Sequence, residues 1–211
     1  MPLRCVVFDC DGVLLDSVPV KTRAFGRLAE PWGEEARDRF VAYHTAHGGV
    51  SRYQKFIWFF REIVGREITP GESEDWGRRF SEIVREEMRR CPCIAGAEQV
   101  LRDWKGRLPL YVCSGAPAEE QRAMLAEHGL DGYFDGIFGA PPAKNELLAR
   151  ILKDAGIAPA DALMVGDATT DRDAAAYAGT LFYGVGDLLK GGDHPWGADL
   201  TGLSAFIAGR V

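Results

Sequence analysis

The chain has 211 residues, 46% of them apolar and 27% charged, which provides one sizeable apolar core and excludes a disordered tail protein. Its net charge of −6 argues against a nucleic-acid-binding protein, which would carry an excess of basic residues. No stretch approaches the roughly 18 apolar residues of a membrane-spanning helix, and the N-terminus lacks the pattern of a secretory signal. We therefore expect a cytoplasmic protein without nucleic-acid or membrane partners.

Short apolar runs predict strands that are buried on both faces of a sheet. In chain order they span residues 5–8, 108–112, 162–165 and 181–185, with a weaker strand at 136–138. Helical patterns lie between the later runs, at residues 118–127, 145–155 and 172–178. Glycines follow these helices at typical stop positions, namely Gly129, Gly156 and Gly179. Strands that alternate with helices predict an α/β fold with a doubly wound parallel sheet.

The segment between the first two strands is far longer than a crossover between parallel strands requires. It contains helical patterns at residues 20–29, 34–44, 52–64 and 74–89. In the third pattern Phe56, Phe59 and Phe60 recur at helical spacing, which predicts the core of a small bundle. We therefore expect an α-helical cap domain inserted into a separate core domain. The cap takes residues 17–90 and the core takes residues 1–16 and 91–211.

Charge and cysteine usage add two expectations. Residues 17–90 carry 14 basic and 12 acidic side chains, whereas the rest of the chain carries 11 and 19. A mildly basic cap above an acidic core predicts a cation in the core and an anion between the two parts. Most of the five cysteines lie in or beside apolar runs and are expected to be buried, reduced thiols. Cys91 and Cys93 have no partners for a zinc site, and the sequence leaves their role open.

Carboxylates follow two of the predicted strands directly. Asp9 and Asp11 follow the first strand, and Asp167 follows the strand at 162–165. Ligands bind at the carboxyl ends of parallel strands, so these side chains would meet at one edge of the sheet. Three adjacent carboxylates are costly without a cation, and their oxygen atoms suit Mg²⁺. A solvated turn is the alternative for the first motif alone, and helix capping is the alternative for Asp171.

Two further positions are candidates for binding phosphate. Ser114 and Gly115 follow the second predicted strand, where a hydroxyl and an amide at the start of a helix can bind phosphate oxygens. A simple helix cap is the alternative there. Lys144 begins the next helical pattern, where a cation opposes the helix dipole, so another role could hold it in place. A surface lysine is the alternative for this position.

Taken in order, these residues resemble the haloacid dehalogenase superfamily. The matching positions are Asp9-x-Asp11-Gly12-Val13, Ser114-Gly115, Lys144 and Gly166-Asp167-x-x-x-Asp171. The helical insertion directly after the first motif is also the pattern of this family. The resemblance covers nearly the whole chain and implies a Rossmann-like sheet with a mobile cap and Mg²⁺ as the cofactor.

The resemblance also implies roles for the acidic residues. Asp9 would attack phosphorus and become an aspartyl phosphate. Asp11 would protonate the leaving oxygen and then activate the water that hydrolyses the intermediate. Asp9, the backbone carbonyl of Asp11 and the carboxylate of Asp167 would hold the metal. Asp171 would act through a water molecule or by contacting the residues that bind the metal directly.

The remaining implied roles concern the phosphate and the rest of the substrate. Ser114 and the Gly115 amide would hold the phosphate, and Lys144 would bridge the phosphate and Asp9. In the cap, Lys21 lies near the hinge, and Arg52 ends a Gly-Val-Ser-Arg loop. Arg52 is expected either to pair with a second anionic group of the substrate or simply to cap the helix that begins there.

These features predict a Mg²⁺-dependent phosphatase that hydrolyses a small phosphorylated metabolite, with phosphoglycolate phosphatase as the nearest activity. Asp11 indicates phosphate chemistry, since halide-releasing relatives lack an Asp at this position. A sugar phosphomutase like β-phosphoglucomutase is the alternative, because Gly49-Val50-Ser51-Arg52 reproduces its cap loop, although Lys21 stands where the mutase has a histidine. A non-enzymatic receiver module is disfavoured by the inserted helices. The substrate cannot be read from the sequence, nor can the oligomeric state, although a monomer is compatible with it.

Overall fold

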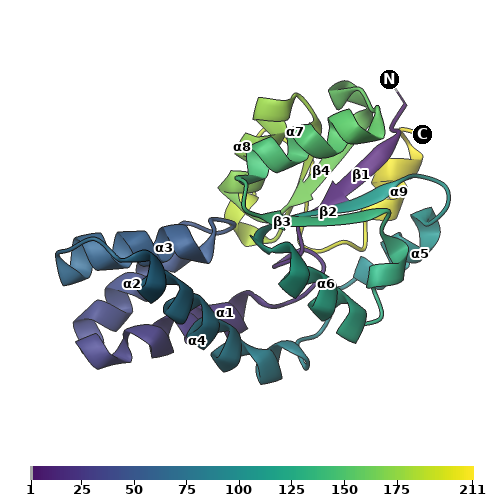
Figure 1. The fold of residues 1–211 in the computed structure, drawn as a ribbon. Helices are drawn as coiled ribbons and strands as arrows, with labels where there is room; N and C mark the ends of the chain where they lie inside the picture. Colours follow the sequence, from purple (N-terminus) through teal and green to yellow (C-terminus); the bar gives the residue numbers. More distant parts are fainter. Residues whose placement is uncertain (1) are drawn as a thin grey trace.

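The computed structural model describes residues 2–211, so Met1, which the expected core range includes, lies outside the described part. Within residues 2–211 a six-stranded parallel sheet forms the centre of the core (Figure 1). The strands are β1 (Cys5–Phe8), β2 (Leu110–Pro117), β3 (Gly136–Ala140), β4 (Ala162–Gly166), β5 (Leu181–Val185) and β6 (Trp196–Gly197). They lie in the order β3-β2-β1-β4-β5-β6, with every neighbouring pair parallel. This arrangement confirms the predicted doubly wound α/β fold.

Helices cover both faces of the sheet because its central strands are apolar on both sides. The covering helices are α5 (Ala97–Trp104), α6 (Ala118–Glu127), α7 (Lys144–Ala155), α8 (Thr169–Ala178) and α9 (Leu203–Ala208). Val6 and Phe8 of β1 pack in one cluster with α5 and α9, whereas Cys5 and Val7 pack in another with α7 and α8. Full burial of each such apolar side chain contributes about 1.5–3 kcal/mol, so the end of β1 is rigidly held.

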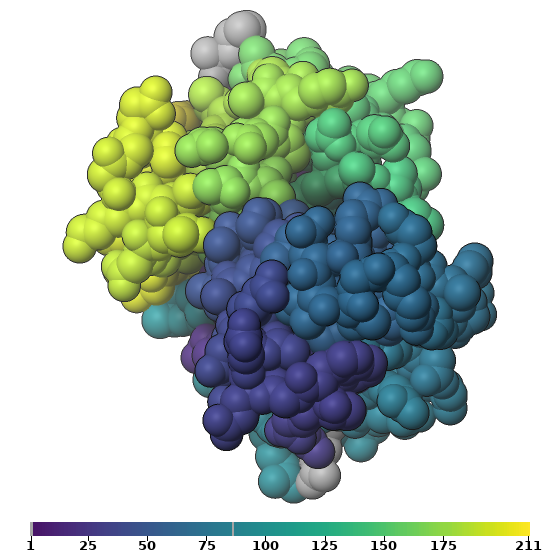
Figure 2. Space-filling view, turned by 90° about the vertical axis from the view of Figure 1, so that its left-hand side faces the viewer, coloured from purple at the N-terminus to yellow at the C-terminus, as the bar shows by residue number. Residues whose placement is uncertain are grey.

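The inserted segment forms helices beside one end of the sheet (Figure 1). These are α1 (Val18–Ala29), α2 (Glu34–Ala46), α3 (Arg52–Phe59), which continues as a π-helical turn (Phe60–Val64), and α4 (Pro70–Met88). The phenylalanines that the sequence assigned to a bundle core are buried, and the rings of Phe56 and Phe59 lie 5.4 and 5.1 Å from Trp76. The bundle-core prediction is confirmed. In Figure 2 the blue cap residues lie directly against the green and yellow core.

Several predicted boundaries differ from those of the structure. The second strand begins at Leu110 and runs through Ser114 and Gly115, because small residues continue its pairing with β3. The fourth cap helix begins at Pro70, since Thr69 and Glu72 form a capping box ahead of it. The sequence reading missed α5, α9 and β6. Short 3₁₀ turns occur at Glu30–Trp32, Asp131–Tyr133, Pro159–Asp161 and Asp187–Leu189. Across residues 2–211, no helix is long and apolar enough to cross a membrane.

Candidate active site

Carboxylates from two adjacent strands meet at the carboxyl end of the sheet. Asp9 directly follows β1, Asp167 directly follows β4, and Asp171 lies in the first turn of α8. Each of the three offers one carboxylate oxygen, and these oxygens all lie within 4.8 Å of one another. Because β1 pairs with β2 on one side and β4 on the other, the cluster sits where the winding of the sheet reverses, a usual position for ligands in such folds.

Asp171 supplies the third carboxylate oxygen of this group, and Asp11 lines the same cavity as Asp9 and Asp167. The carboxylate of Asp11 accepts hydrogen bonds from Ser17 and, at 2.5 Å, from the ammonium of Lys21. Gly12 lies close to Asp167: it has a φ of 76°, and a Cβ there would stand 2.2 Å from the Asp167 Oδ2. The backbone therefore needs glycine here in order to pass so close to the Asp167 carboxylate.

Lys144 joins the cluster from the start of α7. Its Nζ lies 2.9 Å from Oδ2 of Asp9 and 2.5 Å from Oδ1 of Asp171. Burial alone would lower the pKa of Lys144, but the charges of Asp171 and Asp9 raise it well above its usual range. The lysine is therefore a permanent cation, and its position at a helix start is explained by these two carboxylates. The pairing with Asp171 was not predicted.

The charge of the cluster exceeds what Lys144 can neutralise. Burial, together with the charges of Asp171 and Asp11, raises the pKa of Asp9 to about 7 against the opposing effect of Lys144. Burial and the same kind of repulsion, from Asp9 and Asp171, raise the pKa of Asp167 to about 8. Such shifts mark carboxylates that lack a compensating positive charge. An all-oxygen donor set of this kind fits a hard divalent cation such as Mg²⁺.

The predicted phosphate-binding residues lie at the end of β2. Ser114 is fully buried, and its Oγ accepts a hydrogen bond from the Ala116 amide at 3.1 Å. Gly115 and Ala116 line the cavity that contains Asp9. A Cβ at Gly115 would stand 2.1 Å from the carbonyl oxygen of Gly49, so the cap loop packs directly against Gly115. Phosphate binding by Ser114 and Gly115 remains a prediction.

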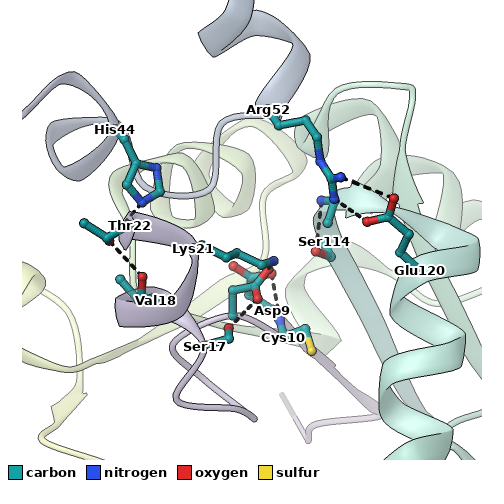
Figure 3. A network of polar contacts seen from close by, with 12 residues as sticks. Asp9, Cys10, Ser17, Val18, Lys21, Thr22, His44, Arg52, Ser114 and Glu120 are labelled. Carbon is teal, nitrogen blue, oxygen red and sulfur yellow. Dashed lines mark hydrogen bonds and ion pairs between the residues drawn. The ribbon is translucent and has the colours of Figure 1, made fainter. Parts of the chain in front are cut away.

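The cap closes over the core through specific polar contacts. The Thr170 hydroxyl donates to the Gly48 carbonyl at 2.9 Å. Arg52, which is 5% exposed, donates to Ser81 at 2.8 Å and forms a two-pronged ion pair with Glu120 of α6 (Figure 3). Its guanidinium also lies 4.6 Å from the centre of the Phe80 ring. The cation that the sequence offered for a second substrate anion is thus already paired with the core.

The resulting cavity has a volume of about 290 Å³ and lies between cap and core. Asp9, Asp11 and Asp167 line it from the core, and Lys55 and His44 line it from the cap. The sequence reading missed the last two residues. A signal for Lys55 was present, because a lysine one turn after Arg52 interrupts the otherwise apolar face that Phe56 and Phe59 continue.

This fold, with buried carboxylates and a lysine at its switch point, is that of an α/β enzyme. The profile of haloacid dehalogenase-like hydrolases matches residues 3–179. The chain belongs to this family, as its motifs had indicated.

Similar proteins are known for both sequence and structure. The phosphorylated carbohydrates phosphatase of Thermotoga maritima is 25% identical over 201 residues, which cover 90% of this chain and 88% of the relative. A phosphoglycolate phosphatase of Chromobacterium violaceum is 27% identical over 215 residues, covering 94% and 91%. The β-phosphoglucomutase of Clostridium difficile has a TM-score of 0.84 at 19% identity and covers 99% and 96% of the two chains. At that identity the likeness establishes the fold alone.

Proposed function

We propose that the protein is a Mg²⁺-dependent phosphatase that hydrolyses a small phosphorylated metabolite through an aspartyl phosphate on Asp9, with phosphoglycolate as the nearest substrate type. The observation that carries this proposal is Lys144, whose ammonium joins Asp9 to Asp171 beside a third carboxylate. The names of the two relatives, phosphatases of phosphorylated carbohydrates and of phosphoglycolate, support it. A small-molecule partner and a cytoplasmic location belong to the same proposal.

The donor set accounts for a magnesium requirement. Three carboxylates and one ammonium leave a formal charge of −2 at the cluster, which one divalent cation balances. Asp9 and Asp167 would hold the ion, with the carbonyl of Asp11 beside them, and Asp171 would orient Lys144 or an intervening water. When bound, Mg²⁺ would supply positive charge to the phosphoryl oxygens during the displacement.

Asp9 is held in position to act as the nucleophile. Its Oδ1 accepts a hydrogen bond from the Cys10 amide at 2.7 Å, and its Oδ2 contacts Lys144. In the first step an oxygen of Asp9 bonds to phosphorus while the bond to the leaving oxygen breaks, and Asp11 protonates that oxygen. In the second step Asp11 takes a proton from water, the water oxygen bonds to phosphorus, and the bond to Asp9 breaks. Inorganic phosphate and the free Asp9 carboxylate result.

Asp11 is present as a carboxylate in this arrangement. Although burial would raise its pKa, the ammonium of Lys21 and the hydrogen bonds from Lys21 and Ser17 lower it below its usual value. This state suits the second step, in which Asp11 accepts a proton. For the first step, Asp11 must exchange its contact with Lys21 for a proton. Lys21 is therefore placed to control the general acid directly.

The proposal is tested by measuring phosphate release from a panel of phosphomonoesters with and without Mg²⁺. We expect repeated turnover, together with a phosphorylated Asp9 peptide detectable by mass spectrometry after rapid acid quenching. The Asp9→Asn variant is the control for the labelled peptide. Stoichiometric phosphorylation without turnover, or phosphate release that leaves Asp9 unlabelled in a single-turnover time course, would contradict the proposal.

A sugar phosphomutase is the second candidate, because the loop that resembles the mutase loop lies directly over the site. The Gly49 carbonyl of this loop faces Gly115, and Gly48 is bound by Thr170. A mutase would return the phosphoryl group from Asp9 to another hydroxyl of the sugar instead of to water. An isomerised hexose phosphate formed without release of phosphate would favour this candidate.

A further inference from the structure

The cap side of the cavity carries a buried lysine that no carboxylate neutralises. Lys55 lies on α3, lines the cavity and is 2% exposed. Its ammonium is 2.8 Å from Nδ1 of His44 and 5.3 Å from the centre of the Phe25 ring. No ion pair joins it to any carboxylate whose side chain the structure describes, that is, in residues 2–211 apart from Glu86. A lysine in such a position is uncommon, because burying an unpaired charge is costly.

The other two cations among the described lining residues are both occupied. Lys21 forms an ion pair with Asp11, and Arg52 forms one with Glu120. Each of them therefore already has a carboxylate partner within the protein. Lys55 is therefore the cation of this cavity that is ready to meet a negative group of the substrate.

A directional chain of hydrogen bonds holds Lys55 in place. Because an ammonium can only donate, Nδ1 of His44 must accept, and the neutral ring carries its proton on Nε2. That proton is donated to Oγ1 of Thr22 at 3.2 Å, and the Thr22 hydroxyl donates to the Val18 carbonyl at 2.8 Å (Figure 3). Burial and the charge of Lys55 lower the pKa of His44 to about 3, which keeps the ring neutral. The chain ties Lys55 to the backbone of α1.

The hydrogen-bonding capacity of Lys55 is only partly used. An ammonium has three donors, and His44 accepts one of them. In the described chain no other hydrogen bond from this ammonium occurs. The two remaining donors can be satisfied by oxygen atoms of a ligand in the cavity, which would also supply the missing negative charge.

We propose that Lys55 is the residue that determines substrate specificity, and that it binds a carboxylate carried by the leaving group. This proposal rests on the phosphatase activity proposed above. A carboxylate fits better than a second phosphate, because Lys55 supplies one positive charge and no planar fork for a dianion. Asp9 and Lys55 line the same cavity, so the phosphoryl group and the carboxylate belong to one small molecule, and the substrate class is a phosphorylated hydroxy acid. Thr22 and His44 act as positioning residues.

The electrostatics of the free protein support this role. Burial, and after it the charge of Lys21, lowers the pKa of Lys55 to about 7. The charged or titratable groups that face Lys55 are His44 on α2, Lys21 on α1, Asp11 after β1, Asp167 after β4 and Lys144 on α7. A bound carboxylate would favour the charged form of Lys55, so binding and protonation would support each other.

The test compares substrates that differ in charge and not in shape. Phosphoglycolate is paired with phosphoglycolamide, and 3-phosphooxypropanoate is paired with its amide. For Lys55→Met we expect kcat/KM for the preferred acid to fall about 10- to 100-fold, mainly through KM, as expected for the loss of a charged hydrogen bond. The same variant should hydrolyse the corresponding amide within about twofold of the wild-type rate. Lys153→Met, an exposed lysine on α7, is the matched control and should behave as wild type.

The outcomes separate this inference from the proposed function. If the wild-type protein releases phosphate from no ester, including p-nitrophenyl phosphate, the phosphatase itself fails. If it is active but prefers neither acid over its amide, the role of Lys55 fails and the phosphatase stands. The role also fails if Lys55→Met loses activity equally on acid and amide, or on neither.

A separate measurement tests the hydrogen bonds that run from Lys55 through His44 to Thr22. Thr22→Val keeps the size of the side chain and removes the acceptor of the His44 proton. We expect KM for the acid to rise about 3- to 10-fold, as for the loss of one neutral hydrogen bond, with kcat and the amide unaffected. Thr45→Val, which changes a threonine that lines the cavity and has no hydrogen bond to His44 among the described contacts, is the control. Equal changes for acid and amide would show that Thr22 serves only the fold.

Discussion

The core and the cap each bury a lysine near the cavity, Lys144 behind the lining residue Asp9 and Lys55 in the lining itself, and the two lysines have different partners. Lys144 of the core lies between Asp9 and Asp171 and keeps its charge whatever substrate is present. Among the described side chains, the ammonium of Lys55 in the cap contacts the neutral His44 and the ring of Phe25 and has no carboxylate partner. The lysine of the core is therefore neutralised by carboxylates of the protein, whereas the positive charge of the cap lysine is left to be neutralised by a ligand. The difference matches what each must recognise: a phosphoryl group common to all substrates, and a leaving group that varies.

Substitutions in the core should abolish activity on every substrate. Asp9→Asn removes the nucleophile, and we expect the loss of several orders of magnitude in kcat. Asp11→Asn removes the general acid and base and should cost about 10²- to 10⁴-fold. Single-turnover kinetics on an acid and its amide measure both effects. Near-native turnover by a folded, metal-loaded Asp9→Asn protein would exclude Asp9 as the nucleophile.

Metal removal should also affect all substrates alike. Three carboxylates cannot approach a phosphate dianion without added positive charge, so exhaustive chelation should reduce phosphate release to background. Adding Mg²⁺ back should restore it, and calorimetry should show weaker Mg²⁺ binding by Asp167→Asn. Full activity on every monoester after chelation would contradict the assignment of the carboxylate cluster as a metal site.

The pH dependence of the cap lysine should separate acids from amides. Below about pH 7 Lys55 is charged and binds a carboxylate, and above this pH the free protein loses that charge. The ratio of kcat/KM for the acid to that for the amide should therefore fall above pH 7, by at most about tenfold per pH unit. Because both substrates carry the same phosphate, titration of the phosphate and of the core cancels in this ratio. A ratio that stays constant from pH 6 to pH 9 would refute the prediction.

Arg52 lies in the cap but should behave like a residue of the core. Its pairing with Glu120 holds the cap closed, so Arg52→Ala should slow hydrolysis of acid and amide equally, by up to about tenfold. Arg23→Ala, which breaks the exposed ion pair with Glu87, is the control and should have little effect. A loss confined to the acid would instead restore Arg52 as the contact for the second anionic group.

The smallest expected effect is on stability. Burial lowers the pKa of Lys55 in the folded protein to about 7, below its usual value of 10.5, so its buried charge destabilises the fold most at or below pH 7. This destabilisation fades as the pH rises toward 10.5, because the folded protein has already released the proton. Lys55→Met should thus be more stable than wild type by about 1–3 kcal/mol at pH 6, with a smaller difference at pH 9. Urea unfolding at the two pH values measures this, and a larger gain at pH 9 would contradict it.

Much of the fold and part of the site could be predicted from local patterns. The strand at residues 5–8 is bounded by its own apolar run, and the carboxylates after it follow from chain order alone. Helix α5 was missed because its apolar stripe is short, although Leu101 and Trp104 are fully buried by packing against distant elements. The ion pair between Lys144 and Asp171 was not predicted, because spacing along the chain does not report which way a side chain turns.

The sequence by itself determined the order of the motifs, and with it the class of fold, the inserted cap and the family. Only the tertiary structure decided how the charges are paired. Arg52 meets Glu120 because α3 of the cap packs against the distant α6 of the core, and Lys55 meets His44 because α3 packs against α2. Burial makes each such pairing selective. A lysine in a sequence has the same charge everywhere. Whether that charge is paired within the protein or available to bind a ligand depends on which carboxylates the fold brings into contact with it.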